Sequence, residues 1–188
     1  MSSANDDQLI SRCLDGDPTA FGELVRRYQD RLYSTVYRLV DNTEDAQDVV
    51  QDAFLSAYQS LPSFHGDSAF FTWLYRIAVN TAISLRRKQR LVYSIESGRN
   101  GESGIEPLDQ SESNRPDHGL ERAEEERRIQ DALNRLSPEH RTVLILKDME
   151  GQKYEVMAEI LGVPIGTIRS RLHRARLELR QILERDEA

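Results

Sequence analysis

YEVMAEILGVPIGTIRSRLHRARLELR, which runs from Tyr154 to Arg180, contains two helical patterns separated by a glycine. Apolar side chains recur at helical spacing in the first pattern, at Val156, Met157, Ile160 and Leu161. Gly162 permits the left-handed backbone of a tight turn, and Pro164 is the predicted first residue of a second helix. This spacing indicates a helix-turn-helix, in which the second helix is free to enter a DNA major groove.

The second helix has an apolar side and a basic side. At about 100° per residue, the side predicted to face the core holds Ile168, Leu172, Ala175 and Leu179. Ser170, His173 and Arg174 fall away from it, with arginines on both flanks. Residues 169–180 contain five arginines and one glutamate, and arginine binds phosphate or pairs with guanine through two hydrogen bonds. The alternative is a solvated basic helix that only closes a small bundle.

The remainder of the chain also has helical patterns and no alternating strand pattern. In the N-terminal part, helical spacing is followed by Phe21, Leu24, Val25, Tyr28, Leu32 and Val36. Asp17-Pro18 predicts one helix start, Asn42 or Thr43 predicts the cap of the next, and Ser137-Pro138 predicts another. These patterns place the protein in the all-α class.

A polar segment separates two helical parts. Residues 94–119 are rich in Ser, Gly, Glu and Asp, and they cannot bury enough apolar surface to offset the entropy of ordering them. The sequence therefore predicts two small helical domains, residues 1–91 and 120–188, joined by a flexible acidic linker over residues 92–119.

The charges of the chain are unevenly distributed. The 188 residues carry a net charge of -7, yet residues 70–93 hold five cations and no acid. A local basic patch points to a partner, whereas the average charge bears only on solubility. Cys13 is the single cysteine, so no internal disulfide is possible. No stretch predicts a membrane span or a signal peptide, and we expect a cytoplasmic protein.

The basic patch forms a second candidate site. As a helix, residues 70–90 turn an apolar side inward, with Phe70, Phe71, Leu74, Ile77, Ala78, Thr81 and Leu85. An outward stripe then holds Trp73, Arg76, Asn80 and Arg87. Aromatic rings stack on bases and cations follow the phosphates, so the stripe is a candidate single-strand nucleic-acid surface. Packing of Trp73 in the core, with solvated arginines, is an equally good interpretation.

Two motifs carry a resemblance to a known family. FHGDSAFFTWLYRIAVNTA (residues 64–82) and GQKYEVMAEILGVPIGTIRSRLHRARLEL (residues 151–179) resemble, in this order, the sigma-70 family of RNA polymerase sigma factors. The resemblance is to the small extracytoplasmic function (ECF) type, and it covers nearly all of the chain outside the linker. It implies that residues 1–91 are a sigma-2 domain and residues 120–188 a sigma-4 domain.

The resemblance also implies roles for individual residues. It implies a base-flipping loop and minus-10 promoter contacts at Phe64, His65, Gly66, Asp67, Ser68, Phe71, Trp73, Arg76, Asn80 and Arg87. It implies minus-35 contacts at Thr167, Arg169, Ser170, Arg171, His173, Arg174 and Arg176. Core polymerase is expected to meet Asp45, Asp48, Gln51 and Asp52. On sequence alone, an ordinary solvated face is the first interpretation of those last four.

The partners implied by the resemblance are macromolecules. They are core RNA polymerase, through its β′ clamp helices and β flap, promoter DNA, and an anti-sigma factor. No cofactor, metal or small-molecule substrate is expected. The acidic remainder of the chain fits a factor that binds DNA poorly alone, because phosphate contacts dominate non-specific affinity.

Two other classes of function compete with this interpretation. A dimeric one-component regulator would account for the helix-turn-helix but leaves the stripe at residues 73–87 unexplained. For an enzyme, Gly66-Asp67-Ser68 resembles an esterase nucleophile motif but lacks the strand-to-turn context. The four histidines are scattered, and the sequence has no glycine-rich phosphate loop. We therefore do not expect an enzyme.

Overall fold

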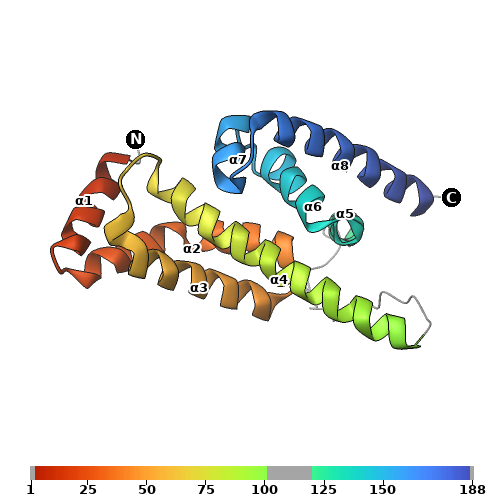
Figure 1. Cartoon of the computed structure of the whole chain (residues 1–188), viewed down its shortest axis with the longest axis horizontal. Helices are drawn as coiled ribbons and strands as arrows, with labels where there is room; N and C mark the ends of the chain where they lie inside the picture. Colours follow the sequence, from red (N-terminus) through yellow and green to blue (C-terminus); the bar gives the residue numbers. More distant parts are fainter. Residues whose placement is uncertain (1–2, 101–119, 187–188) are drawn as a thin grey trace.

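The computed structural model describes the backbone of residues 3–100 and 120–186 and the side chains of residues 5–89 and 124–186. Within these ranges all regular secondary structure is helical and no strand occurs, so the predicted all-α class is confirmed (Figure 1). No helix in the described part of the chain is both long and apolar enough to cross a bilayer.

The N-terminal bundle consists of α1 (Ser3–Leu14), α2 (Pro18–Val40), α3 (Thr43–Ser60), the 3₁₀ turn η1 (Leu61–Ser63) and α4 (Phe70–Asn100). Its helices begin where local capping chemistry requires. Asn42 caps α3, since its side chain accepts a hydrogen bond from the N–H of Asp45 at 2.9 Å. Asp41 adopts the left-handed conformation that ends α2, with φ of 56°.

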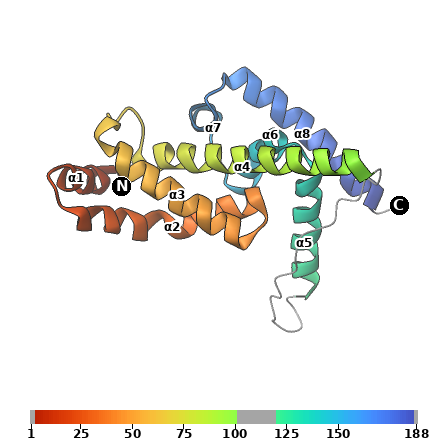
Figure 2. The same ribbon diagram turned by 60° about the horizontal axis from the view of Figure 1, so that its bottom comes forward.

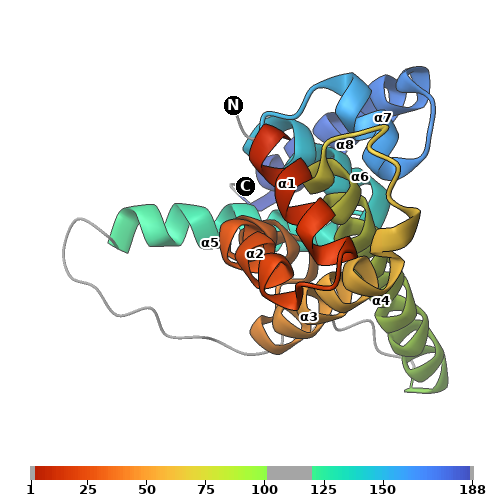
Figure 3. The ribbon, with the colours of Figure 1, turned by 90° about the vertical axis from the view of Figure 1, so that its left-hand side faces the viewer.

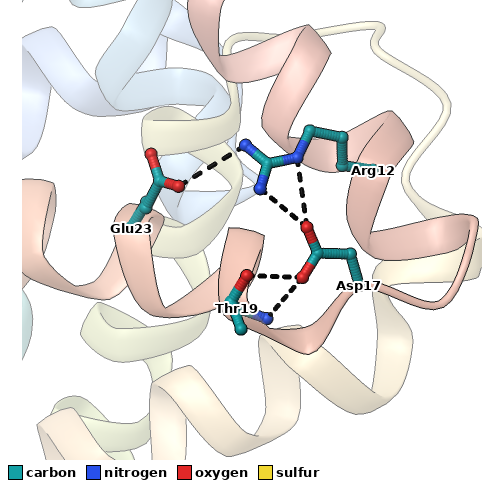
Figure 4. Close-up of polar contacts among 4 residues, drawn as sticks. All are labelled: Arg12, Asp17, Thr19 and Glu23. Carbon is teal, nitrogen blue, oxygen red and sulfur yellow. Dashed lines mark hydrogen bonds and ion pairs between the residues drawn. The ribbon is translucent and has the colours of Figure 1, made fainter.

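The start of α2 is the most elaborate cap in the bundle. The carboxylate of Asp17 accepts from the N–H of Thr19 at 3.0 Å, and Pro18 occupies the first helical position (Figure 4). Arg12, at the end of α1, approaches the other carboxylate oxygen at 2.7 Å. One side chain therefore caps α2 and ties α1 to it.

The C-terminal bundle consists of α5 (Leu120–Arg135), α6 (Pro138–Leu144), the π-turn η2 (Ile145–Met149), α7 (Tyr154–Leu161) and α8 (Ile165–Asp186). Ser137 caps α6 as the sequence predicts, since its hydroxyl accepts from the N–H of His140 at 3.2 Å. The N-terminal end of α5 projects away from the remainder of the molecule (Figures 2 and 3), whereas its C-terminal end carries the buried Ala132 and Leu133. No apolar pattern or capping residue in the sequence predicts the π-helical turn between α6 and α7.

Helix α4 is the member of the N-terminal bundle that lies next to the C-terminal bundle (Figure 1). It contacts α2 and α3 on one side and α6 and α7 on the other. The buried apolar side chains of both bundles form one continuous cluster, from Leu9 to Ala175. The arrangement brings the C-terminal bundle against the basic segment of α4.

Helix α4 also runs further than the sequence predicts. It continues to Asn100, so its backbone covers residues 92–100 of the segment expected to be linker. Once a helix is nucleated, each further residue adds a hydrogen bond, and the sequence has no proline until Pro107. The other residues of the expected linker, 101–119, lie outside the described residues.

Candidate nucleic-acid interface

The loop before α4, residues 64–69, is anchored by contacts of its first residue and is exposed at its centre. The N–H of Phe64 donates to the carbonyl of Leu61 at 3.0 Å, and the Phe64 ring lies 5.9 Å from Phe70, edge to face. Gly66 has φ of 75°, a left-handed conformation that favours glycine. His65, Gly66 and Asp67 are exposed and Ser68 is half-buried. The loop therefore presents polar groups above an aromatic base.

Trp73 belongs to that aromatic base. Its ring is half-buried and packs 5.1 Å from Phe64 and 5.8 Å from Phe70, centroid to centroid. The structure thus gives Trp73 a packing role, one of the two interpretations left open by the sequence, while part of its surface stays accessible. Of the three polar members of the predicted stripe, Arg76 and Asn80 are exposed, and the Arg87 side chain is 61% exposed.

Phe71 is placed apart from this group. Its ring lies 5.0 Å from Tyr28 and 5.1 Å from Tyr75, and the guanidinium of Arg31 stands 4.3 Å above it. The structure therefore does not bring Phe71 together with Trp73, although both were assigned to the same DNA element. Phe71 instead joins α4 to α2.

Helix α4 is buried on more sides than its sequence pattern predicts. Tyr75, Val79 and Ala82 are fully buried, although none belongs to the predicted inward side. The Tyr75 hydroxyl donates to Thr35 Oγ1 at 2.6 Å, and burial raises the pKa of Tyr75 well above its usual value, so it remains a neutral donor. A helix covered by two bundles cannot show a single apolar stripe.

The helix-turn-helix has the predicted turn. Gly162 ends α7 in the left-handed conformation, with φ of 63°, and its N–H donates to the carbonyl of Ala158. Helix α8 begins at Ile165, one residue after the predicted Pro164, whose carbonyl accepts from the N–H of Thr167 at 2.9 Å. The predicted core side is confirmed, because Ile168, Leu172 and Ala175 are buried and Leu179 packs against them.

Some polar side chains of α8 have a partner within the protein, and others have none among the described residues. Arg176 Nε donates to Asp148 Oδ2 at 3.0 Å, and the guanidinium of Arg169 lies 5.6 Å from the ring centre of Tyr154. Ser170 donates to the carbonyl of Thr167, a half-buried residue in the first turn. His173 and Arg174 are exposed and have no hydrogen-bond or charge partner among the described residues. These two side chains are therefore free to meet a ligand.

Tyr154 was not among the predicted site residues. Its ring makes cation–π contacts with Arg169 and also with Lys147, whose Nζ lies 4.9 Å from the ring centre. Tyr154 therefore places a cation from η2 beside a cation from α8. The available signal was an aromatic residue at the first position of α7, seven residues after a lysine. Lys147 and Arg169 approach each other only through the fold, which the sequence pattern did not reveal.

The four polar residues of α3 do not converge on one point. Asp45 accepts from Gln89 Nε2 at 2.8 Å and so faces α4. Gln51 lines a hollow between α2 and α3 together with Val25, Gln29, Asp30, Tyr33, Gln47, Val50 and Phe54. Asp48 and Asp52 are exposed. Any partner that contacts all four must cover about a third of the helix circumference.

A cleft lies between α4 and the C-terminal bundle, and we call it the interdomain cleft. It is lined by Asn80, Ile83, Ser84, Arg87, Glu139, Thr142, Leu161, Val163 and Arg171. Two residues assigned to the minus-10 element and one assigned to the minus-35 element therefore face the same space. Part of each predicted DNA surface thus lines the cleft, while Arg76, His173 and Arg174 remain exposed.

Two family profiles match the chain, in the order of the two bundles. Sigma-70 region 2 matches residues 24–92, and Sigma-70 region 4 matches residues 126–179. The chain is 38% identical to the RNA polymerase sigma-H factor of Pseudomonas aeruginosa, over 98% of this chain and 96% of that protein. It is 41% identical to the ECF RNA polymerase sigma-E factor of Escherichia coli K12, over 91% and 90% respectively.

Solved structures agree with these matches. The structure of CnrH in complex with the cytosolic domain of CnrY superposes with a TM-score of 0.69 at 26% identity, covering 97% of this chain and 99% of that one. The sigma factor RpoE in complex with the anti-sigma factor NepR, from Bartonella quintana, gives a TM-score of 0.65 at 29% identity, with 87% and 96% covered.

Proposed function

The chain belongs to the sigma-70 family of RNA polymerase sigma factors, in its ECF subfamily, and from this membership we propose how its own residues act. Sigma factors of this family are transcription initiation factors rather than enzymes. The proposal is that this protein binds core polymerase, recognises minus-35 and minus-10 promoter elements and promotes DNA opening. The observation that carries it is the match of both family regions, in order, to the two bundles that hold the candidate DNA-binding side chains.

The minus-10 element is assigned to the loop at residues 64–69 and to the exposed residues of α4. Extruding a base requires unstacking, which costs a few kcal/mol, so a shaped site must offset it. The aromatic base formed by Phe64, Phe70 and Trp73 supports the loop from below. Arg76 and Asn80 follow one and two turns further along α4, in reach of the adjoining nucleotides.

The minus-35 element is assigned to α8. His173 and Arg174 are exposed and unheld, so they are available for base edges. Arg169 lies beside the Tyr154 ring and is open to a phosphate, whereas Arg176 must exchange its partner Asp148 for one. Thr167, Ser170 and Arg171 complete the assigned set. The remaining contacts, with the β′ clamp helices at α3 and with the β flap, stay predictions from the family.

An anti-sigma factor is the further partner we propose. Support comes from RpoE of Bartonella quintana, which was solved in complex with one. Affinity capture of the tagged chain from its own host would supply candidates. A captured protein qualifies only if, once purified, it suppresses the transcripts of the assay described below. We expect all these partners to be met in the cytoplasm, where promoter DNA lies.

Run-off transcription tests the function directly. Purified bacterial core polymerase is supplied with a pool of promoter fragments, with and without the protein. Specific transcripts that depend on the protein are expected, and their aligned upstream sequences define its promoter preference. A protein that neither binds core nor yields transcripts, but protects a palindromic duplex by itself, would instead be a one-component regulator.

A further inference from the structure

Arg87 is engaged by a carboxylate of the other bundle. Its Nε donates to Glu139 Oε1 at 3.0 Å, and its Nη2 donates to the same oxygen. Burial alone would raise the pKa of Glu139, but hydrogen bonding to Arg87 and the charges of Arg87 and Arg171 lower it. Glu139 is therefore an anion at neutral pH, placed where two residues assigned to DNA meet.

A second set of polar contacts closes the other end of the interface. Arg38 of α2 pairs with Glu150 at 2.9 Å, and the carbonyl of Arg38 accepts from Arg141 Nε at 2.9 Å. Gln130 donates to the same carbonyl at 3.3 Å. The last carbonyls of a helix carry partial negative charge and lack helical partners, so donors from α5 and α6 are well placed there.

This closed arrangement is incompatible with simultaneous reading of both promoter elements. The elements are centred about 25 base pairs apart, which is about 85 Å along B-form DNA at ~3.4 Å per base pair. In the closed form Asn80 and Arg87 share one cleft with Arg171. The two bundles must separate before each can reach its own element.

We propose that the closed form is an intramolecular off-state, in which Glu139 takes the place of a promoter phosphate on Arg87. The proposal rests on the function proposed above, because it assigns Arg87 to DNA. A carboxylate and a phosphate offer guanidinium the same charged acceptor oxygens, so they compete for it directly. DNA or polymerase that draws the bundles apart releases Arg87.

The polar contacts that close the interface are individually modest. The side chain of Arg87 is largely exposed, and exposed ion pairs are screened and contribute little. Arg141 is 2% exposed, and its two terminal nitrogens have no hydrogen-bond partner within the described structure. Burying an unpaired cation opposes closure. Beside the apolar cluster that both bundles share, the polar part of the interface thus combines several modest attractions with one unfavourable burial of charge.

Interdomain fluorescence energy transfer tests the closure itself. Cys13 is first changed to Ser, and dyes are attached at Ser56→Cys in α3 and Gln181→Cys in α8, both exposed positions. Glu139→Gln is expected to lower the closed-to-open ratio by about two- to fivefold, the range for one exposed ion pair. Glu155→Gln is the matched control, because Glu155 is an exposed first-turn acid of α7 without a charge partner among the described residues.

Exchanging the two charges tests whether Arg87 and Glu139 interact directly. Arg87→Glu should open the molecule, and adding Glu139→Arg to it should restore the transfer efficiency. Circular dichroism confirms that each variant is folded. If Glu139→Gln matches its control, or if the exchanged pair does not restore closure, the proposed contact is overturned.

Run-off transcription then tests whether closure inhibits. With limiting protein, Glu139→Gln should yield about two- to fivefold more transcript than either wild type or Glu155→Gln. If Glu139→Gln opens the molecule and transcript does not rise, the off-state is overturned while the contact stands. If wild type gives no transcript with core polymerase, the failure is that of the proposed function, and the energy transfer still reports closure.

Discussion

Arg174 and Arg176 lie two residues apart on α8 but differ in their contacts within the protein. Arg174 is free of partners among the described residues, whereas Arg176 is paired with Asp148. If Arg174 is bidentate to guanine, Arg174→Ala should weaken binding to the minus-35 element by about 1–3 kcal/mol. Arg176→Ala should weaken binding less and uniformly across sequences, because a phosphate contact carries no base preference. Holoenzyme binding to wild-type and substituted minus-35 duplexes measures the loss of affinity for both variants. An equal loss of affinity on all sequences for Arg174→Ala would contradict its base-reading role.

Variants of Trp73 and Asn80 distinguish two roles, packing beneath the minus-10 loop and direct contact with DNA. Asn80→Ala should impair promoter opening without lowering thermal stability, because its side chain is exposed. Trp73→Ala should impair opening and also cost about 1–3 kcal/mol of stability, since the half-buried ring packs on Phe64 and Phe70. Permanganate reactivity of the opened strand and thermal unfolding give the two readouts. Wild-type opening by both variants would remove the stripe from the DNA-binding site.

At the scale of the element, the turn of the helix-turn-helix depends on the backbone of Gly162. A Cβ there would meet no atom within 4 Å, so a substitution is strained only by φ of +63°. Gly162→Ala should therefore cost about 1–2 kcal/mol of unfolding free energy, and Gly162→Asn less, because asparagine tolerates this conformation. Gly166→Ala, inside α8 and equally unobstructed, should instead be neutral or stabilising. Urea unfolding compares them, and equal effects of the two alanines would refute the assignment.

The cap of α2 gives the protein a component of acid sensitivity. Hydrogen bonds from Thr19 and Arg12 lower the pKa of Asp17 from 3.8 to about 2. The stabilisation is therefore complete above about pH 4 and is lost as the pH falls through about 2. Asp17→Asn should destabilise the protein at pH 5, and the gap to wild type should shrink toward pH 2. Urea unfolding across this pH range measures the difference in stability between wild type and Asp17→Asn. Asp15→Asn is the control, because Asp15 is a nearby carboxylate without a side-chain partner among the described residues. A difference in stability that stays constant with pH would contradict the role of Asp17.

These elements also show which parts of the fold the sequence can predict. The caps at Asp17, Asn42 and Ser137 and the turn at Gly162 depend on groups within a few residues, so local patterns identified them. The burial of Tyr75, Val79 and Ala82 depends on how α4 packs against helices distant in sequence, such as α2, where Tyr75 reaches Thr35. Tyr154 was missed for the same reason, because Arg169 approaches it only through the fold. Trp73 remained undecided because helical periodicity does not specify how the loop before α4 folds back onto the ring.

At the scale of the whole molecule, the closed arrangement depends on contacts that connect distant parts of the chain. Arg87 and Glu139 are 52 residues apart, and Arg38 and Glu150 are 112 apart. The sequence did predict the basic segment of α4 and the basic face of α8. It gave no indication that the two share a cleft, because nothing in periodicity or composition specifies how two helical bundles dock.

We expect Arg141 to influence how readily the molecule opens. Burial, with a smaller effect from the charge of Arg86, lowers the pKa of Arg141 to about 9, so the guanidinium is still charged at pH 7. Closure therefore buries a cation with two unpaired nitrogens, against one hydrogen bond to Arg38, whose carbonyl also accepts from Gln130. Arg141→Met keeps much of the length of the side chain and removes the charge. It should raise the closed-to-open ratio at least about fivefold, or ~1 kcal/mol, by analogy with apolar replacement of buried ions.

The same labelled protein measures this change, and the transcript yield at limiting protein should fall in parallel if the closed form is inactive. Arg135→Met offers a control, because Arg135 is exposed and pairs with Asp186 within the C-terminal bundle. Opening of the molecule by Arg141→Met would mean that the bond from Nε to the Arg38 carbonyl outweighs the buried charge, and Arg141 would then hold the interface closed. A higher closed fraction would mean that the chain keeps a buried cation which weakens the contact between its own DNA-binding surfaces.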